Sequence, residues 1–255
     1  MNEDISKIFS IGPHRHLCAD ATQAENYKIL MNEQQAQLLL ADPPYCLLTR
    51  RNKAGQLRDP KRAKINHEAV TRYENVRAYM QFTKQWLHTC CQHLTENAVL
   101  CIWTNFLGKA PITAVCKELG YNHFYGEYNW VKLTKEGGGN EKLARLYEVA
   151  LVFSKVPASL LNSDSPAPCW TVLGHYDDHK EAGKWENHPN HKSFNVLGPL
   201  IRNFSRPGDL VLDPFTGSGS TPAACIKLER IIAGLELRDK WAKITRERMA
   251  TLVPS

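Results

Sequence analysis

Short apolar runs alternate with helical spacings along most of this chain. Apolar runs bounded by turn residues predict six strands, at residues 36–41, 99–103, 129–132, 147–153, 209–213 and 231–236. Apolar positions three and four residues apart predict helices at residues 76–94, 111–119, 196–204, 220–228 and 240–252. This alternation is typical of an α/β domain, in which helices cover a parallel or mostly parallel sheet. The second and third helices in this series are separated by two strands, 129–132 and 147–153, which we expect to form a hairpin-like pair.

Residues 157–189 interrupt the alternation. The stretch is rich in Pro, Ser, Asp and His and has little periodicity, so it predicts a loop or a small insertion.

Composition sets the class of protein. The 255 residues, 43% hydrophobic and 23% charged, are enough for one α/β domain with a sizeable core, so we expect a single domain over 1–255. No apolar run reaches the roughly 18 residues of a membrane span, and the first ten residues show no secretory signal. Eight cysteines without a CxxC pair favour reduced thiols in a cytoplasmic protein. The net charge of +6 leans weakly towards a polyanionic partner.

The strongest local motif is a glycine-bearing loop between a strand and a helix. The strand ends at Asp213, and Gly217 and Gly219 allow the backbone to turn tightly and approach a ligand. Glu236 ends the next strand, where a carboxylate can accept hydrogen bonds from both ribose hydroxyls of a nucleoside cofactor. A glycine turn that merely packs a helix on a strand is the alternative. Because the full GxGxxG pattern is absent, a nucleoside cofactor without a pyrophosphate fits better than NAD.

A second motif, Asp42-Pro43-Pro44-Tyr45, follows a predicted strand at the edge where open α/β sheets place their chemistry. The two prolines stiffen the turn and fix two hydrogen-bond acceptors, the Asp42 carboxylate and the Pro43 carbonyl. Such acceptors would hold the N–H bonds of an exocyclic amine out of the ring plane and localise its lone pair. Tyr45 offers a flat face for a base drawn out of the duplex. A simple loop stop is the alternative interpretation.

A basic stretch follows this turn directly. Between Cys46 and Tyr73 there are eight Lys and Arg residues against Asp59 and Glu68, so phosphate contacts beside the base are expected, with a solvated loop as the alternative. We assign DNA contacts within residues 46–75 to Arg50, Arg51, Lys53, Arg58, Lys61, Arg62 and Lys64.

Together these motifs resemble the β class of DNA amino-methyltransferases, in which the catalytic half precedes the S-adenosylmethionine (AdoMet) half. The resemblance covers most of the chain. It implies a Rossmann-like AdoMet-dependent methyltransferase fold, with a mostly parallel seven-stranded sheet and helices on both faces. Asp42 to Tyr45 is similar to the catalytic motif, Asp213 to Gly219 to the AdoMet loop, and Glu236 to the ribose-binding acid. The segment His188-Pro-Asn-His-Lys192 resembles the HPxxK motif, whose Lys and following residues approach the methionine end of the cofactor.

Shorter similarities extend the match. Asp20, in Cys18-Ala-Asp-Ala21, matches the residue that reads the cofactor's adenine amine. Trp130 with Lys132, Glu148 and Arg248 match further recurring positions. Cys46, Ser193 and Ser220 depart from the usual Gly, Pro and Thr. The resemblance implies these cofactor-binding residues: Asp20, Ala21, Asp42, Lys192, Ser193, Asp213, Phe215, Thr216, Gly217, Ser218, Gly219 and Glu236.

The function implied is transfer of the AdoMet methyl group to N6 of a flipped-out adenine in double-stranded DNA. Cytosine N4 is the alternative target, and a catalytically silent DNA-binding protein is the alternative from another class. RNA or protein glutamine is a third kind of acceptor, but glutamine enzymes typically carry Asn-Pro-Pro-Tyr. Cytosine-C5 chemistry is disfavoured because Pro168-Cys169 follows Glu74-Asn75-Val76, the reverse of the usual order.

The resemblance also bears on partners and specificity. Residues 157–187 occupy the place of the target-recognition element, and a homodimer and a partner restriction endonuclease are expected from the family. We expect no metal, since Cys169, His175 and His179 form a weak zinc pattern.

Overall fold

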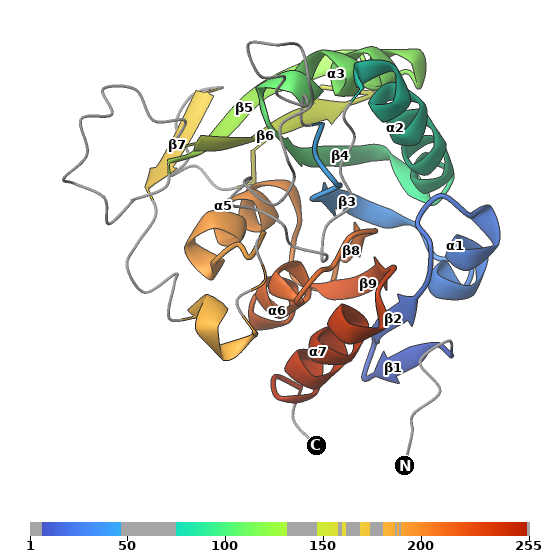
Figure 1. Ribbon diagram of the computed structural model, residues 1–255, viewed down its shortest axis with the longest axis vertical. Helices are drawn as coiled ribbons and strands as arrows, with labels where there is room; N and C mark the ends of the chain where they lie inside the picture. The colour runs from blue at the N-terminus through green and yellow to red at the C-terminus, as the bar shows by residue number, and fades with distance from the viewer. Residues whose placement is uncertain are drawn as a thin grey trace, which may run out of the picture.

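The computed structural model describes residues 7–46, 75–131, 147–157, 160–161, 169–173, 181–186, 188 and 190–253. Within them, one sheet has the strand order β1-β2-β9-β8-β3-β4-β6-β5-β7 (Figure 1). The strands are β1 (Phe9–Ile11), β2 (His14–Cys18), β3 (Ala36–Ala41), β4 (Leu94–Thr104), β5 (His123–Val131), β6 (Tyr147–Ser154), β7 (Cys169–Leu173), β8 (Leu210–Asp213) and β9 (Ile231–Glu236). Five of the eight neighbouring pairs are parallel, and β1 and β6 run against the rest.

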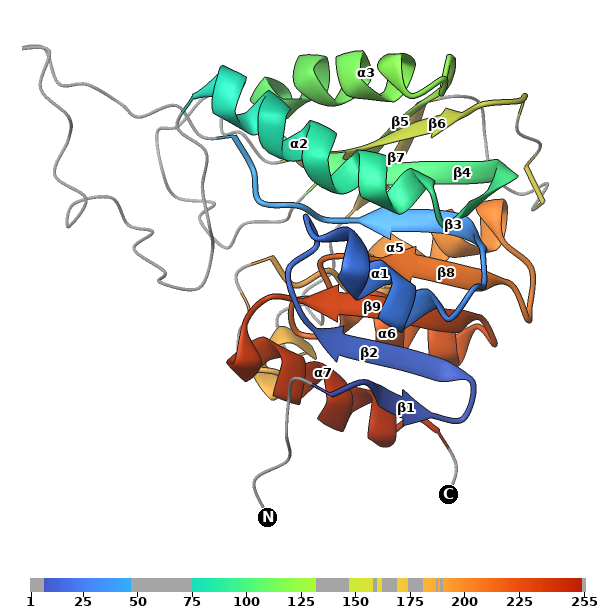
Figure 2. The ribbon, with the colours of Figure 1, turned by 90° about the vertical axis from the view of Figure 1, so that its right-hand side faces the viewer.

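Helices cover both faces of this sheet (Figure 2). Helices α1 (Ala24–Met31), α2 (Val76–Cys91) and α3 (Lys109–Glu118) share one core cluster with the sheet. Helices α5 (Phe194–Phe204), α6 (Ser220–Lys227) and α7 (Asp239–Ala250) share the other. The mostly parallel sheet with two helical layers confirms the expected α/β fold class.

The central strand β3 shows why this sequence forms a two-sided core. Leu38 and Leu40 point into one cluster, while Leu39 and Ala41 point into the other, as the two-residue period of a strand requires. All four side chains are buried. A strand buried on both faces reads as a continuous apolar run, which is the pattern that predicted it.

The described sheet has nine strands where seven were expected. The additional strands are the short edge strands β1 and β7, of three and five residues. β7 lies inside the stretch expected to be irregular and pairs in parallel with β5. Edge pairing of this kind depends on backbone hydrogen bonds to a neighbour distant in sequence, and a five-residue strand carries little periodicity of its own. The strands β5 and β6 form the expected antiparallel pair.

The connections after β3 and β8 leave the sheet on opposite faces. The two strands are parallel neighbours, with Leu39 beside Leu212. The chain after β3 leads to α2 on one face, and the chain after β8 leads to α6 on the other. Neighbouring strands whose connections diverge in this way open a crevice at their carboxyl ends, which is where open α/β sheets bind ligands. The two sequence motifs therefore meet at one edge of the sheet.

Candidate active site

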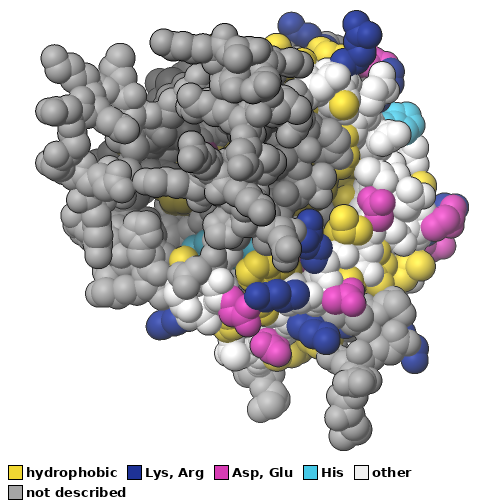
Figure 3. Space-filling model, viewed as in Figure 1, with side chains coloured by type: hydrophobic (Ala, Val, Ile, Leu, Met, Phe, Trp, Pro, Cys, Tyr) yellow, Lys and Arg dark blue, Asp and Glu magenta, His cyan; other side chains and the backbone are white. Residues whose placement is uncertain are grey.

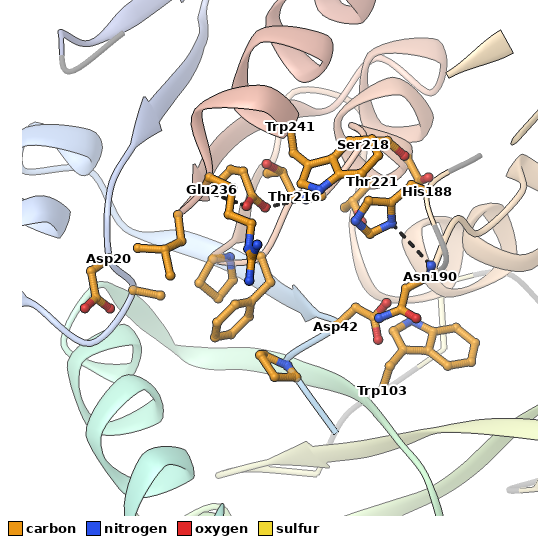
Figure 4. A pocket seen from close by; sticks show the side chains of 18 of the residues that line it. Asp20, Asp42, Trp103, His188, Asn190, Thr216, Ser218, Thr221, Glu236 and Trp241 are labelled. Atoms are coloured by element: carbon orange, nitrogen blue, oxygen red, sulfur yellow. Dashed lines mark hydrogen bonds between the residues drawn. The ribbon is translucent and has the colours of Figure 1, made fainter. Parts of the chain in front are cut away.

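A cavity of about 360 Å³ lies at this edge. Its lining comes from the ends of β2, β3, β4, β8 and β9, from helices α2, α6 and α7, and from the segment before α5. Figure 4 shows Asp20 and Glu236 towards one end and Asp42 with Trp103 and Asn190 towards the other. This volume falls within the range of pockets that bury most of a small ligand.

The glycine loop closes one wall of the cavity. Gly217 and Gly219 have φ angles of 53° and 79°, in the left-handed region that favours glycine. The Gly217 N–H donates to Glu236 Oε2 at 2.9 Å, and the Arg238 N–H donates to Oε1 at 2.9 Å. A Cβ on Gly217 would lie 3.0 Å from the His188 ring, so glycine allows this close approach. The loop thus holds a buried carboxylate that backbone N–H groups fix in place and that can still accept from a further donor.

Aromatic rings and an acid define the end of the cavity near α2. The Phe215 ring stands edge-on to Trp86 with centroids 5.1 Å apart and lies 6.1 Å from Phe82. Asp20 Oδ1 accepts from the backbone N–H and the hydroxyl of Thr22, at 2.8 and 2.9 Å. These local bonds fix the direction of the carboxylate. The arrangement suits a flat ring that carries an amine.

A neutral histidine supports the glycine loop from beneath. His16 Nε2 lies 3.0 Å from Thr216 Oγ1. Burial, with a smaller contribution from Arg246, lowers the pKa of His16 to about 3. A Cβ on Gly234 would lie 2.5 Å from Thr216 Cγ2, so the loop packs directly on β9. The position of Thr216 is therefore fixed from two sides.

The HPxxK segment packs against the glycine loop, with the His188 ring beside Gly217. The His188 ring meets Trp241 edge-on at a centroid distance of 4.4 Å, and His188 Nδ1 accepts from the Asn190 N–H at 3.2 Å. Burial lowers the pKa of His188 to about 4, with Lys192 adding to the effect, so the ring is neutral. Arg248 reaches the same region from α7, where it donates to the Ser218 carbonyl at 3.3 Å.

The Asp-Pro-Pro-Tyr turn presents a compact group of ionisable side chains. Lys192 Nζ lies 2.5 Å from Asp42 Oδ2 and 3.2 Å from Glu148 Oε2. The Tyr45 hydroxyl lies 2.9 Å from Asp42 Oδ1 and 3.0 Å from Glu148 Oε2. Lys192 also sits 4.8 Å above the Trp103 ring, close enough for a cation–π contact.

Charge and burial oppose each other in this group. Burial raises the pKa of Asp42, while Lys192 lowers it and Glu148 raises it further. For Lys192, burial alone would lower the pKa, but the two carboxylates reverse this and raise it. Burial and the same carboxylates raise the pKa of Tyr45 well above its ordinary value. The site therefore holds a charged Lys and an un-ionised phenol between two carboxyl groups.

Most of the residues expected to bind a cofactor line this cavity: Asp20, Ala21, Asp42, Lys192, Phe215, Thr216, Gly217, Ser218 and Glu236. Asp213, Ser193 and Gly219 lie outside the lining. Asp213 accepts from the Phe215 N–H at 2.9 Å, so it shapes the loop instead, and Ser193 precedes α5 as its N-cap. Within the Asp-Pro-Pro-Tyr turn, Asp42 and Pro44 line the cavity. Tyr45 is not part of the lining, but its hydroxyl donates a hydrogen bond to Asp42.

Several lining residues carried no signal in the sequence. They include Phe82, Gln85 and Trp103, which reach the cavity from α2 and β4, and Leu237, Arg238 and Trp241 near α7. The aromatic members have the helical or strand spacing of ordinary core residues, so periodicity alone could not separate them. All seven predicted DNA-contacting residues, and Lys132, lie outside the described residues.

The sequence profile of the DNA methylase family that includes N6 and N4 enzymes matches residues 36–247. The chain belongs to this DNA methylase family. As a DNA methylase it uses AdoMet and acts on an exocyclic amine of adenine or cytosine in DNA. The type II methyltransferase M.HpaI of Haemophilus parainfluenzae is 23% identical over 254 residues, covering 92% of this chain and 74% of its own.

Solved structures of other methyltransferases share the fold of this DNA methylase. The M1.HpyAVI–SAM complex superposes with a TM-score of 0.66 at 18% identity, covering 92% of this chain and 98% of its own. The cytosine-N4-specific PvuII DNA methyltransferase superposes with a TM-score of 0.63 at 15% identity, covering 98% of this chain and 95% of its own.

The residues of the cavity fit AdoMet. The Glu236 carboxylate has the acceptors that a ribose diol needs. Ser218 is buried at the lining, and its Oγ has no hydrogen-bond partner among the described residues. In the part of the chain that the structure describes, no helix is long and apolar enough to cross a membrane, and no group of three His, Cys, Asp or Glu residues could hold a metal ion.

Proposed function

We propose that this DNA methylase transfers a methyl group to N6 of adenine, and that Asp42, Pro43, Pro44 and Tyr45 form its catalytic turn. The observation that carries the proposal is the position of Asp42, which lines the cofactor cavity at the end opposite Asp20. An acid at this motif position is commoner in adenine enzymes, as the sequence resemblance implies. An amine donating to Asp42 would face the methyl donor across the cavity.

AdoMet supplies an already activated methyl group, so the protein has mainly to position two reactants. We assign the adenine of AdoMet to Asp20 and Phe215, and its ribose to Glu236. The amino-acid end is assigned to the wall formed by Asn190 and Ser218. This order places the reactive centre beside Asp42.

Asp42 and the Pro43 carbonyl would accept the two N–H bonds of the amine and so localise its lone pair. The Lys192 ammonium keeps Asp42 oriented through their 2.5 Å contact. The Tyr45 ring, whose hydroxyl contacts Asp42, would offer a flat face to an extruded base.

The DNA duplex is assigned to the segments that flank this site. We propose phosphate contacts for the basic stretch within residues 46–75 and target recognition for residues 157–187. On the face in Figure 3, the described Lys and Arg side chains lie among Asp and Glu side chains and form no single large patch. The support for the phosphate contacts is the charge of the basic stretch itself, with eight Lys and Arg residues against Asp59 and Glu68. Homodimerisation and a partner restriction endonuclease stay predictions of the family.

Incubation with labelled AdoMet and unmethylated genomic DNA, followed by nucleoside analysis, tests the proposal. We expect N6-methyladenine. Label in N4-methylcytosine would overturn the choice of base, and no label in DNA would overturn the function.

The variant Asp42→Ala tests the role of the turn. It should abolish methyl transfer and leave AdoMet affinity within a few-fold, because the adenosine contacts lie at the other end of the cavity. Near-normal turnover in this variant would reject the catalytic assignment.

A further inference from the structure

The Tyr45 hydroxyl lies within hydrogen-bond distance of two carboxyl groups. Its oxygen is 2.9 Å from Asp42 Oδ1 and 3.0 Å from Glu148 Oε2. The three residues come from two distant parts of the chain, since Glu148 lies on β6 and the other two follow β3. Glu148 is held there by strand pairing, which sets it beside Trp130 of β5.

One hydroxyl proton cannot serve both contacts. A phenol donates a single hydrogen bond, and an ionised carboxylate only accepts. With both carboxylates ionised, one of the two oxygen–oxygen contacts would lack a proton and would be repulsive. One additional proton on either carboxyl group removes this conflict, because that group then donates to the phenol oxygen while the phenol donates to the other. The geometry therefore accommodates one further proton.

The charges around the cluster favour the same proton count. Lys192 Nζ contacts both carboxyl groups, at 2.5 and 3.2 Å, and its side chain is 3% exposed. One buried ammonium group thus contacts both carboxyl groups. Two like charges that share a buried site raise the proton affinity of one of them. Asp213 is a further carboxyl group whose charge interacts with Asp42.

We propose that Glu148 is a positioning and proton-accepting residue: with Asp42 and the bridging Tyr45 it forms a two-carboxylate acceptor for the proton that the methylated amine releases. This inference rests on the proposed function and adds a residue to its mechanism. Glu148 acts through Tyr45 and Lys192 and does not itself contact the base.

The amine lone pair forms the new N–C bond, and the sulfur of AdoMet keeps the electron pair of the S–C bond that breaks. The positive charge gained by the nitrogen leaves as a proton when one N–H bond breaks and an O–H bond forms on Asp42. Asp42 then donates to the Tyr45 oxygen, and the Tyr45 proton moves to Glu148 Oε2. No oxidant or further reactant is needed.

The variant Glu148→Gln tests this role because it keeps the size of the side chain but accepts no proton. We expect its single-turnover rate on the plateau of the pH profile to fall roughly 10²-fold, the low end of the contribution of positioned acid–base groups. The acid limb of the profile should move to lower pH, since Glu148 no longer raises the proton affinity of Asp42. A merely structural residue would lower the rate without moving the limb, and that result, or an unchanged rate, would overturn the proposal.

A second readout needs neither cofactor nor DNA. Infrared difference spectra of the free protein follow the C=O band of a protonated carboxyl group as the pH is lowered. In Glu148→Gln this band should appear at lower pH than in the unmodified protein. An identical titration in the two proteins would overturn the proposal, even if the variant were too unstable for kinetics.

Two further variants separate the cluster from its surroundings. Tyr45→Phe keeps the ring and removes the bridge, so combining it with Glu148→Gln should lower the rate little beyond either single change; additive losses would contradict a shared path. Glu127→Gln is the matched control. Glu127 lies on the neighbouring strand β5 and forms an ion pair with Lys109 at 2.8 Å, so this variant should leave the pH profile of the rate unchanged. If the unmodified protein methylates DNA and only the Glu148 expectations fail, the proposed function stands and this inference falls.

Discussion

The buried carboxyl group of Glu236 makes the affinity for the nucleoside part of AdoMet depend on pH. Burial raises the pKa of Glu236 to about 7, and the Arg238 and Gly217 N–H groups oppose the rise. Ribose hydroxyls are donors and bind the ionised carboxylate more strongly. Affinity should therefore be full above pH 7 and fall as Glu236 takes up a proton below it.

The size of the effect follows from that pKa. If only the ionised form binds, the dissociation constant is multiplied by 1 + 10^(pKa − pH), which is about 1.1 at pH 8 and about 11 at pH 6. The difference is about tenfold, or roughly 1.4 kcal/mol. Glu236→Gln should bind about 5- to 30-fold more weakly at pH 8, because it loses about 1–2 kcal/mol of charge-assisted hydrogen bonding. Its affinity should no longer change between pH 6 and pH 8.

Isothermal titration calorimetry with 5′-methylthioadenosine measures this effect cleanly. That ligand keeps the adenine and ribose but lacks the ionisable amino-acid end, so the protein alone titrates. A dissociation constant that stays level from pH 8 to pH 6 would refute the reasoning. So would the same tenfold change in Glu236→Gln, since another group would then be responsible.

Two other predictions concern the loop and the fold. Gly234→Ala places a methyl group 2.5 Å from Thr216 Cγ2. The resulting overpacking should lower the free energy of unfolding in denaturant by roughly 1–3 kcal/mol and weaken AdoMet binding. If neither quantity changed, the loop would have to move aside without cost, and the reasoning would be wrong. The free protein should lose stability as the pH rises from about 4 to 7. Burial raises the folded-state pKa values of Asp213 and Glu236 to about 7, above their ordinary values of 3.8 and 4.5. The folded state therefore binds these two protons more tightly than the unfolded state, and this contribution to stability is lost as the protons dissociate. The test is the melting temperature between pH 4 and pH 7, which should fall as the pH rises and should fall less in Glu236→Gln than in the unmodified protein.

The sequence predicted the parts of the site that backbone geometry imposes. A loop that must turn tightly needs glycine, and two prolines stop a strand, so both motifs are visible without a structure. Glu236 was visible because it ends the strand after the loop. The carboxyl ends of parallel strands share one edge, which brings these segments together in space.

Side chains that reach the cavity through packing left no such trace. Phe82 and Trp103 look like core residues in the sequence, because a helix face and a buried strand both require apolar positions there. The partner of Tyr45 could not be derived either, since the contact with Glu148 depends on the register of an antiparallel strand placed between β4 and β5. A shift by one residue would turn Glu148 to the other face of the sheet.

The order of the two motifs along the chain has no bearing on the chemistry, because the sheet determines which groups meet. Asp42 follows β3 and the glycine loop follows β8, and these strands are hydrogen-bonded neighbours although most of the chain separates them. Each strand contributes only the few residues after its carboxyl end. Any chain order that keeps β3 beside β8, with connections leaving on opposite faces, therefore gives the same crevice. The positions of Asp42, Lys192 and Glu148 are fixed instead by their contacts with one another: removing Lys192 would leave two buried carboxyl groups without a cation, and removing either carboxyl group would remove one of the two contacts that hold Lys192.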